Sequence, residues 1–303
     1  MAEFDCIVIG GGPAGLSAAI YLARFHLSVA VFDDGRSRAA LIPLTRNLAG
    51  FPVGVGGRDL LRRMRVQAEG FGARMRADTV EGLAPQDGGF ALTAGDRHWR
   101  ASRVLLATGV INLAPKMKPD AHDDALRCGL LRYCPVCDGH EVTDRRVALL
   151  GSGPHGLAEA QFMRSFSRDV SLVAPSGPHG FDESRRAALA EWGIAAIDGP
   201  VDAIVAGRDD IALQVAGETH CFDTLYAALG TALRSELARA AGAQTAPDGA
   251  VLVDRHQMTS VEGLYAAGDV VKGLDQIATA MGQAAIAATA MRNAICAERP
   301  LRR

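Results

Sequence analysis

The sequence of 303 residues has few cysteines, no excess of charge of one sign and no long apolar run. Its six cysteines are too few for a disulfide scaffold, and this usage fits a reducing cytoplasm best. The 32 basic and 34 acidic residues nearly cancel, which argues against nucleic acid or an anionic membrane as partner. No segment has the roughly 18 uninterrupted apolar residues that span a bilayer. We therefore expect a cytoplasmic protein that binds neither nucleic acid nor membrane.

Two similar strand–turn–helix–strand segments organise the chain. The first has an apolar strand over 4–9, a helix over 13–25 and a second strand over 28–32. The second has a strand over 146–150, a helix over 157–167 and a strand over 170–173. With about 150 residues per domain, the length predicts two domains. We expect the α/β class: two Rossmann-like dinucleotide-binding domains, the second (115–240) inserted into the first (1–114 and 241–303).

The first glycine motif has the context of a dinucleotide site. Gly10, Gly12 and Gly15 follow a strand and open a helix, so backbone N–H groups and the positive end of the helix dipole face one point. Asp33 follows the next strand, where an acid accepts a hydrogen bond from an adenosine ribose. Asp34 competes for this role, because predicted strand ends are uncertain by a residue or two.

The second glycine motif, Gly151, Gly153 and Gly156, has the same context but lacks a clear nucleotide selector. The end of its second strand, 173–176, supplies neither the acid that suits an NAD ribose nor the arginines that suit a 2′-phosphate. Arg185 and Arg186 come later and could reach back, although a solvated helix face is the simpler interpretation. The sequence therefore leaves open whether this domain binds NADPH, NADH or no nucleotide.

Cys134 and Cys137 are two residues apart and lie between the two glycine motifs. Such a pair can form a small-ring disulfide, and a redox role is favoured over a zinc knuckle with Cys128 and His140, because that spacing matches no standard finger. Asp138 beside the pair is a candidate proton carrier, with an Asp-Gly turn as the alternative. We take Cys134, Cys137 and Asp138 as the catalytic candidates and expect no metal.

Two predicted strands end in small residues, one at 104–109 and one at 263–269, and an alanine-rich helix predicted over 276–293 follows the second. Asp269 could bond a ribityl hydroxyl of a flavin, and the following helix would direct its N-terminus at the pyrimidine edge. A helix-capping role for Asp269 is compatible with this one.

These motifs together resemble the low-molecular-weight thioredoxin reductase family over nearly the whole chain. The elements that carry the resemblance are Gly10-Gly11-Gly12-Pro13-Ala14-Gly15, Asn47-Leu48-Ala49-Gly50-Phe51-Pro52, Ala107-Thr108-Gly109, Cys134-x-x-Cys137-Asp138-Gly139, the glycine motif at Gly151 and Ala266-Ala267-Gly268-Asp269. The resemblance implies a homodimer, a discontinuous FAD domain and an inserted domain with a nicotinamide site and the redox cysteines. It also implies rotation of the inserted domain, with Cys137 as the sulfur nearer the flavin.

The resemblance also enlarges the expected cofactor site. To the glycines of both motifs, Asp33 and Asp269 it adds Pro13, Ala14, Asn47, Ala107, Thr108, Gly109, Gly268, Gln276 and Ile277. Three segments depart from the family: Gly35-Arg36-Ser37-Arg38 replaces Gly-Gly-Gln, Ala174-Pro175-Ser176 replaces His-Arg-Arg, and Asp275-Gln276-Ile277 replaces Arg-Gln-Ala. We expect FAD to bind despite these changes, whereas the preference for NADPH does not follow.

The expected activity is FAD-dependent disulfide oxidoreduction. Electrons from NAD(P)H would pass through FAD to the Cys134–Cys137 disulfide and on to thioredoxin or a similar disulfide substrate. The alternatives are a dithiol oxidase that uses oxygen, or a reductase with a non-nicotinamide donor such as ferredoxin. From another class, a non-catalytic flavin-bound redox sensor would be reduced once without turnover.

Overall fold

The structure is a computed structural model that describes residues 2–86 and 88–301. The chain forms two compact units, of which the inserted one comprises Thr45–Asn47 and Asn112–Ala232. The sequence placed its end at residue 240 instead. Residues 233–240 belong to the first unit because their short helix, α7 (Glu236–Ala240), packs on it, with Ala238 fully buried in that unit's core.

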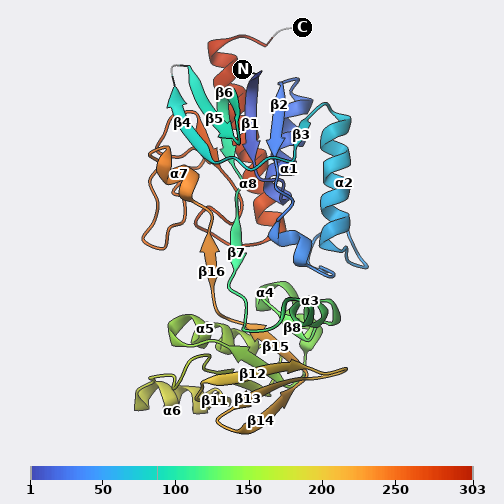
Figure 1. The fold of residues 1–303 in the computed structure, drawn as a ribbon, viewed down its shortest axis with the longest axis vertical. Helices are drawn as coiled ribbons and strands as arrows, with labels where there is room; N and C mark the ends of the chain where they lie inside the picture. The colour runs from blue at the N-terminus through green and yellow to red at the C-terminus, as the bar shows by residue number, and fades with distance from the viewer. Residues whose placement is uncertain (1, 87, 302–303) are drawn as a thin grey trace. The chain divides into compact units, whose positions relative to one another are not determined.

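The first unit is built on a seven-stranded sheet of order β3-β2-β1-β6-β5-β4, with β17 beside β6 (Figure 1). Neighbours among β3, β2, β1, β6 and β17 are parallel, and β4 and β5 extend the sheet as an antiparallel hairpin. The strands are β1 (Ala2–Ile9), β2 (Val29–Phe32), β3 (Arg74–Arg76), β4 (Gly82–Gln86), β5 (Gly89–Ala94), β6 (Arg97–Leu106) and β17 (Leu264–Ala266).

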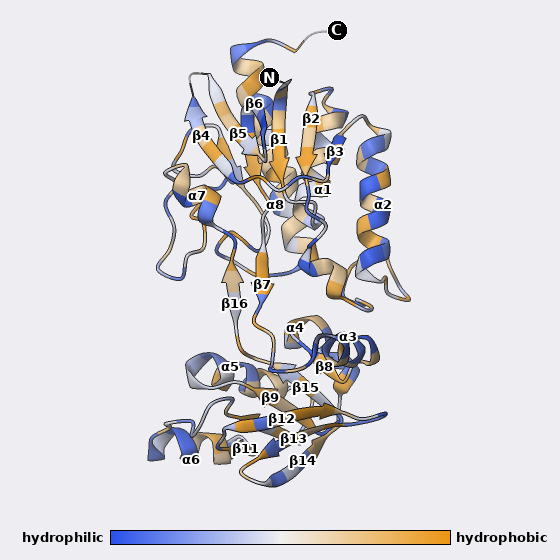
Figure 2. Cartoon of the chain, viewed as in Figure 1, coloured by the Kyte–Doolittle hydropathy of each residue, from blue (hydrophilic) through white to orange (hydrophobic). Residues whose placement is uncertain are grey.

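Small residues bring two helices of this unit together. Helices α1 (Pro13–Arg24) and α8 (Ile277–Glu298) share one core cluster, in which Ala18, Ala284 and Ala288 are completely buried. Alanine favours helix and lets two backbones approach closely. Helix α2 (Gly57–Gly70) buries only a stripe with a four-residue spacing, including Leu60 and Met64, and its remaining surface is mostly hydrophilic (Figure 2). A short 3₁₀ helix, η1 (Arg38–Leu41), precedes it.

The inserted unit has a parallel sheet of order β11-β10-β9-β15-β8 and an antiparallel sheet of order β12-β13-β14. Its parallel strands are β8 (Leu131–Arg132), β9 (Val147–Leu150), β10 (Val170–Val173), β11 (Ile194–Ile197) and β15 (Thr224–Ala227), and its antiparallel strands are β12 (Val201–Ala206), β13 (Ile211–Val215) and β14 (Glu218–Phe222). Its helices are α3 (Pro119–Cys128), α4 (Pro135–Asp138), η2 (Gly139–Val142), α5 (Gly153–Met163) and α6 (Glu183–Glu191). The antiparallel sheet shares one core cluster with the parallel sheet. Helices α5 and α6 share a second core cluster with the parallel sheet.

The two units repeat one topology. In the first, β3-β2-β1 is continued by β6, and in the inserted unit β11-β10-β9 is continued by β15. In both, the glycine loop follows the first strand, at the point where the strand order reverses, and this is where open α/β sheets bind ligands. The predicted fold class is therefore confirmed.

The chain passes between the units twice, through β7 (Val110–Asn112) and β16 (Thr231–Leu233), which form a two-stranded sheet. Among the helices of the described residues, none is long and apolar enough to cross a membrane.

Candidate functional site

The first glycine loop is packed so closely that it admits no side chains. A Cβ on Gly10, whose φ is +110°, would lie 2.2 Å from the Ala107 carbonyl oxygen. A Cβ on Gly15 would lie 1.8 Å from the carbonyl oxygen of Gly10. Helix α1 begins at Pro13 and has no side-chain hydrogen bond at its cap. Its first N–H groups are therefore available to an anion at the end of β1.

Asp33, rather than Asp34, faces this loop. A Cβ on Gly11 would lie 2.2 Å from the Asp33 carboxyl carbon, so the Asp33 side chain lies against the loop backbone. Asp34 pairs with Arg36 at 2.6 Å. Although partial burial raises the pKa of Asp34, its hydrogen bonds from Arg36 bring that pKa below the usual value. Asp34 is thus bonded to Arg36, and Asp33 stays the predicted ribose acceptor.

The segment Ala107-Thr108-Gly109 continues from β6 beside the glycine loop. The Ala107 N–H donates to the Ile9 carbonyl at 2.8 Å, and the Thr108 hydroxyl donates to the Arg234 carbonyl at 2.6 Å. Gly109, with φ +65°, accepts a hydrogen bond from the Arg234 N–H at 3.0 Å. Thr108 therefore fastens the returning chain with its hydroxyl, a contact that the sequence did not predict.

The second strand that ends in small residues, β17, leads to the start of α8. Gly268, with φ +81°, lies so close to α1 that a Cβ there would be 3.0 Å from the Ala14 Cβ. Its N–H donates to the Gln283 side chain at 2.8 Å. Gln276 caps α8 and Ile277 is its first residue, and no side-chain hydrogen bond caps this helix either. Ala14 on α1 and Ala280 on α8 both lie near Gly268.

This arrangement fits a dinucleotide. It combines a side-chain-free loop, uncapped helix starts and an acid at the end of β2, which are the groups that receive a pyrophosphate and a ribose. The predicted binding residues of this unit lie around it, and their contacts with a cofactor stay a prediction: Gly10, Gly12, Pro13, Ala14, Gly15, Asp33, Ala107, Thr108, Gly109, Gly268, Asp269, Gln276 and Ile277.

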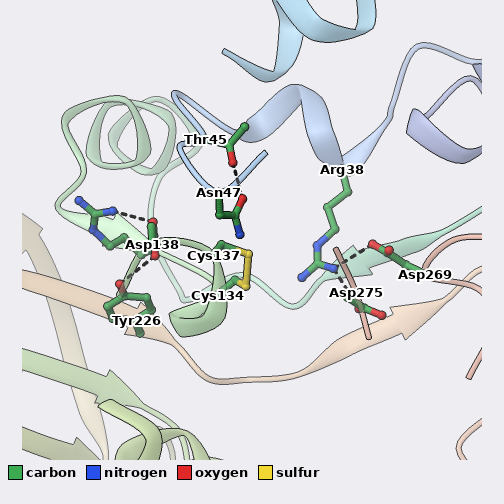
Figure 3. Close-up of a disulfide and its surroundings, with 10 residues drawn as sticks. Arg38, Thr45, Asn47, Cys134, Cys137, Asp138, Tyr226, Asp269 and Asp275 are labelled. Atoms are coloured by element: carbon green, nitrogen blue, oxygen red, sulfur yellow. Dashed lines mark hydrogen bonds and ion pairs between the residues drawn. A yellow bond between two sulfur atoms is a disulfide. The ribbon is translucent and has the colours of Figure 1, made fainter. Parts of the chain in front are cut away.

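Arg38 bridges two carboxylates beside this region (Figure 3). Its Nη1 lies 3.0 Å from an oxygen of Asp269 and 3.0 Å from an oxygen of Asp275. Burial and the neighbouring Asp269 raise the pKa of Asp275, and Arg38 opposes them only in part. The sequence predicted a site role for Asp269 but not for its two partners.

The second glycine loop also turns into a helix, but its glycines are packed less closely than those of the first loop. A Cβ on Gly156 would lie 2.9 Å from the carbonyl carbon of Gly151, and one on Gly153 would meet nothing within 4 Å. Helix α5 begins at Gly153 without a side-chain cap. In the first turn of α5, His155 lies 3.2 Å from Glu159, which is one turn further along the helix. Burial raises the pKa of Glu159, and His155 opposes this effect.

The arginines that could have selected a phosphate in the inserted unit are paired elsewhere. Arg185 donates its backbone N–H to Asp182, the N-cap of α6, at 2.8 Å. Arg186 lies 3.1 Å from Asp198. The Arg185 pair lies at the start of α6, whereas Asp198 follows β11, the strand beside β10, so Arg186 reaches the carboxyl edge of the sheet. The segment that directly follows β10 is Ala174, Pro175 and Ser176.

Cys134 and Cys137 form a disulfide across the single turn of α4. The S–S distance is 2.10 Å and the Cα atoms are 5.3 Å apart. The other four cysteines, Cys6, Cys128, Cys221 and Cys296, are free. No group of three or more His, Cys, Asp or Glu side chains within 2–86 and 88–301 could hold a metal ion.

Asp138, next to the disulfide, is held by two side chains. Arg132 donates to one of its oxygens at 2.6 Å, and the Tyr226 hydroxyl donates to the other at 2.8 Å (Figure 3). Burial raises the pKa of Asp138 above its usual value, and Arg132 and Tyr226 do not cancel this effect. Both carboxylate oxygens thus have partners that the sequence did not predict.

Asn47 belongs to the disulfide's surroundings. Residues 45–47 group with the inserted unit, and the Thr45 hydroxyl donates to the Asn47 side-chain oxygen at 2.7 Å. Figure 3 shows the Asn47 side chain next to the disulfide. The sequence had placed Asn47 with the flavin-binding residues, and that role stays a prediction.

Four residues escaped the sequence analysis: Arg38, Arg132, Tyr226 and Asp275. Arg38 and Asp275 lie in segments that depart from the family, so the departures themselves were the signal. Arg132 and Tyr226 belong to no sequence motif. Arg132 is 6 residues from Asp138 and Tyr226 is 88 residues from it, and the parallel pairing of β8 with β15 places Arg132 beside Tyr226.

Comparison with known proteins agrees with this geometry. The chain belongs to the pyridine nucleotide-disulphide oxidoreductase family, which its residues 4–284 match. It is 30% identical to a thioredoxin reductase of Peptoclostridium acidaminophilum, over 94% of this chain and 95% of that protein. The chain is thus an oxidoreductase similar to thioredoxin reductases, and the predicted family and enzyme class are confirmed. Membership of the family implies flavin and nicotinamide cofactors.

Solved structures show the same fold. The crystal structure of HlmI matches with a TM-score of 0.88 at 27% identity, over 98% of this chain and 93% of that one. A thioredoxin reductase from Streptococcus pyogenes MGAS5005 also has a TM-score of 0.88, at 24% identity, over 98% of this chain and 99% of that one.

Proposed function

We propose that the chain reduces a disulfide substrate, thioredoxin or a similar molecule, with electrons that NAD(P)H delivers through FAD. One observation carries the proposal: the Cys134–Cys137 disulfide lies in the unit that holds the second, uncapped glycine loop. An electron carrier and its nicotinamide donor both need such a loop, and the chain has two of them.

The first glycine loop, Asp33 and Asp269 would hold FAD, and the loop at Gly151, Gly153 and Gly156 would hold the nicotinamide dinucleotide. When bound, FAD supplies two-electron transfer between nicotinamide and disulfide. The protein's part is to place the pyrophosphates on helix N-termini and to exclude side chains from both loops.

The disulfide changes state twice in each cycle. Two electrons break the Cys134–Cys137 bond and leave one thiolate and one thiol. The thiolate of one cysteine attacks a sulfur of the substrate disulfide and forms a mixed disulfide; the other cysteine then attacks that bond, which restores Cys134–Cys137 and releases the substrate as a dithiol. Cys137 would be the sulfur nearer the flavin. Asp138 would carry a proton in this exchange, and its raised pKa suits that task.

One observation favours a second candidate, a dithiol oxidase that passes electrons from a substrate dithiol to oxygen. The end of β10 presents no arginine to a 2′-phosphate, and both nearby arginines pair with aspartates. A chain that needs no NADPH, or that takes electrons from ferredoxin, would tolerate this loss.

The proposal includes a homodimer in the cytoplasm. The dimer follows the family resemblance, and the compartment follows the four free cysteines.

An anaerobic titration of the purified flavoprotein with NADPH, and separately with NADH, tests the donor. Rapid bleaching of the flavin absorbance by either one supports the reductase. If neither bleaches the flavin but a dithiol does, the second candidate replaces it.

Cysteine variants, purified in the same way, test whether the disulfide takes part in turnover. Cys134→Ser and Cys137→Ser should retain FAD and lose at least about 1,000-fold in disulfide turnover, because each lacks the bond that accepts the electrons. Cys128→Ser is the matched control, since Cys128 is a free, exposed cysteine of the same unit. Full turnover in the Cys134 and Cys137 variants would contradict the proposal.

A further inference from the structure

A single guanidinium nitrogen joins two carboxylates in the first unit. Arg38 Nη1 contacts both Asp269 and Asp275 at 3.0 Å, and all three side chains are largely shielded from water, with exposures of 23%, 21% and 35%. The three residues come from η1, the loop after β17 and the residue before the cap of α8.

The charges in this cluster do not balance. One cation faces two carboxylates, so each carboxylate destabilises the charged form of the other. Burial raises the pKa of Asp275, and the neighbouring Asp269 raises it further. The arrangement holds only while Arg38 stands between the two acids.

Two of the three segments that depart from the family resemblance meet here. Arg38 lies in the segment 35–38, and Asp275 opens the segment 275–277. Their hydrogen bond makes the two departures one paired change.

We propose that Arg38 and Asp275 are a pair of positioning residues that fix the Asp269 carboxylate for the flavin. Arg38 holds the carboxylate, and Asp275 holds Arg38 from the opposite side. This inference rests on the proposed binding of FAD at Asp269.

The proposed role of Arg38 and Asp275 predicts how much FAD affinity each variant loses relative to the others. Arg38→Gln leaves two shielded carboxylates facing each other without a cation, so the two groups repel each other and the Asp269 side chain turns away. Asp275→Asn leaves Arg38 bound to Asp269 alone. The double variant removes the cation together with the surplus anion, and it should therefore recover part of what Arg38→Gln loses.

Reconstitution of the apoprotein with FAD measures this order as dissociation constants, from the quenching of flavin fluorescence. We expect Arg38→Gln to bind FAD about 30-fold more weakly, in the range of one lost charged hydrogen bond. Asp275→Asn should lose less than about 5-fold, and the double variant should bind at least 3-fold more tightly than Arg38→Gln. The visible spectrum of the bound flavin gives a second readout without turnover.

Arg36→Gln is the matched control. Arg36 lies in the same segment but pairs with Asp34 and is 67% exposed, so its variant should bind FAD like the wild type. If Arg38→Gln does not fold, Asp275→Asn and the double variant still decide the question through their relative affinities.

Several outcomes overturn the inference. Wild-type affinity in Arg38→Gln, or a double variant that binds no better than Arg38→Gln, would show that the two residues do not act as a pair. A wild-type apoprotein that takes up no FAD would overturn the proposed function as well, so the two failures are distinguishable.

Discussion

The two glycine loops of this chain have the same frame and different surroundings. Each follows the central strand of a parallel sheet at the point where the strand order reverses, and each opens an uncapped helix. At the first loop, Asp33 lies against the glycines. At the second, Ala174-Pro175-Ser176 follows the next strand, and Arg185 and Arg186, which come later in the chain, are paired with aspartates.

The comparison shows that the ability to approach a pyrophosphate and the choice of dinucleotide are separate properties. Glycines determine whether a backbone can approach a pyrophosphate, which is a steric matter within six residues. Ligand choice depends on charges at strand ends, which come from other parts of the chain. A repeated glycine motif therefore does not imply a repeated ligand.

Replacing equivalent glycines by alanine should disrupt the two loops to different extents. Gly15→Ala places a Cβ 1.8 Å from a backbone oxygen, whereas Gly156→Ala places one 2.9 Å from a backbone carbon. We expect Gly15→Ala to lose FAD completely, with a stability loss of about 3 kcal/mol or more. Gly156→Ala should keep FAD and lose reduction by nicotinamide. Absorbance spectra and thermal unfolding measure both, and equal losses of FAD would contradict the contrast.

Asp138 sharpens the comparison, because it places a largely buried acid beside the disulfide of the inserted unit. Asp138→Asn should lower disulfide turnover about 100-fold. Since the pKa of Asp138 is raised, the acid binds a proton more tightly in the folded state, and stability contributed by protonation falls as pH rises from 3.8 through the raised value. The variant should lose this slope and the matching limb of the pH–rate profile.

Asp124→Asn provides the control for this test. Asp124 pairs with Arg127 on an exposed face of α3 in the same unit. An unchanged pH–rate profile in Asp138→Asn would remove Asp138 from the proton transfer.

The acid at the end of β2 can be tested against its neighbour. Asp33→Asn should weaken FAD binding about 10- to 30-fold, because a charged acceptor for a ribose hydroxyl is lost. Asp34→Asn should change affinity less than about 3-fold, since Asp34 is bonded to Arg36. Titration of both apoproteins with FAD measures the difference, and the reverse order would assign the ribose to Asp34.

The smallest effect should come from adding what the second loop lacks. Ser176→Arg places a cation at the end of β10, where a 2′-phosphate would lie, and should shift preference toward NADPH over NADH about 10-fold. Ser176→Gln, polar but uncharged, should not. The ratio of kcat/KM for the two donors is the measurement. No shift in either variant would mean that this loop takes no nicotinamide dinucleotide in that orientation.

Much of the fold could be predicted because its signals are local. Strand β10 lies where the apolar run predicted it, and α1 and β2 differ from expectation by one residue. Helix α5 begins at Gly153, four residues before the predicted start at 157, because its glycine loop already turns in helical geometry. Helix α8 extends to Glu298, beyond the predicted end at 293, since Ile295 continues its buried stripe after Met291.

The sequence by itself determined the two glycine loops, the cysteine pair and the acids after strands, because each depends on residues within a few positions of one another. Only the tertiary structure decided which charges meet: Arg38 with Asp269 across 231 residues, and Tyr226 with Asp138 across 88. The physical reason is that a charge finds its partner through the packing of distant elements, and neither spacing nor periodicity along the chain records that packing.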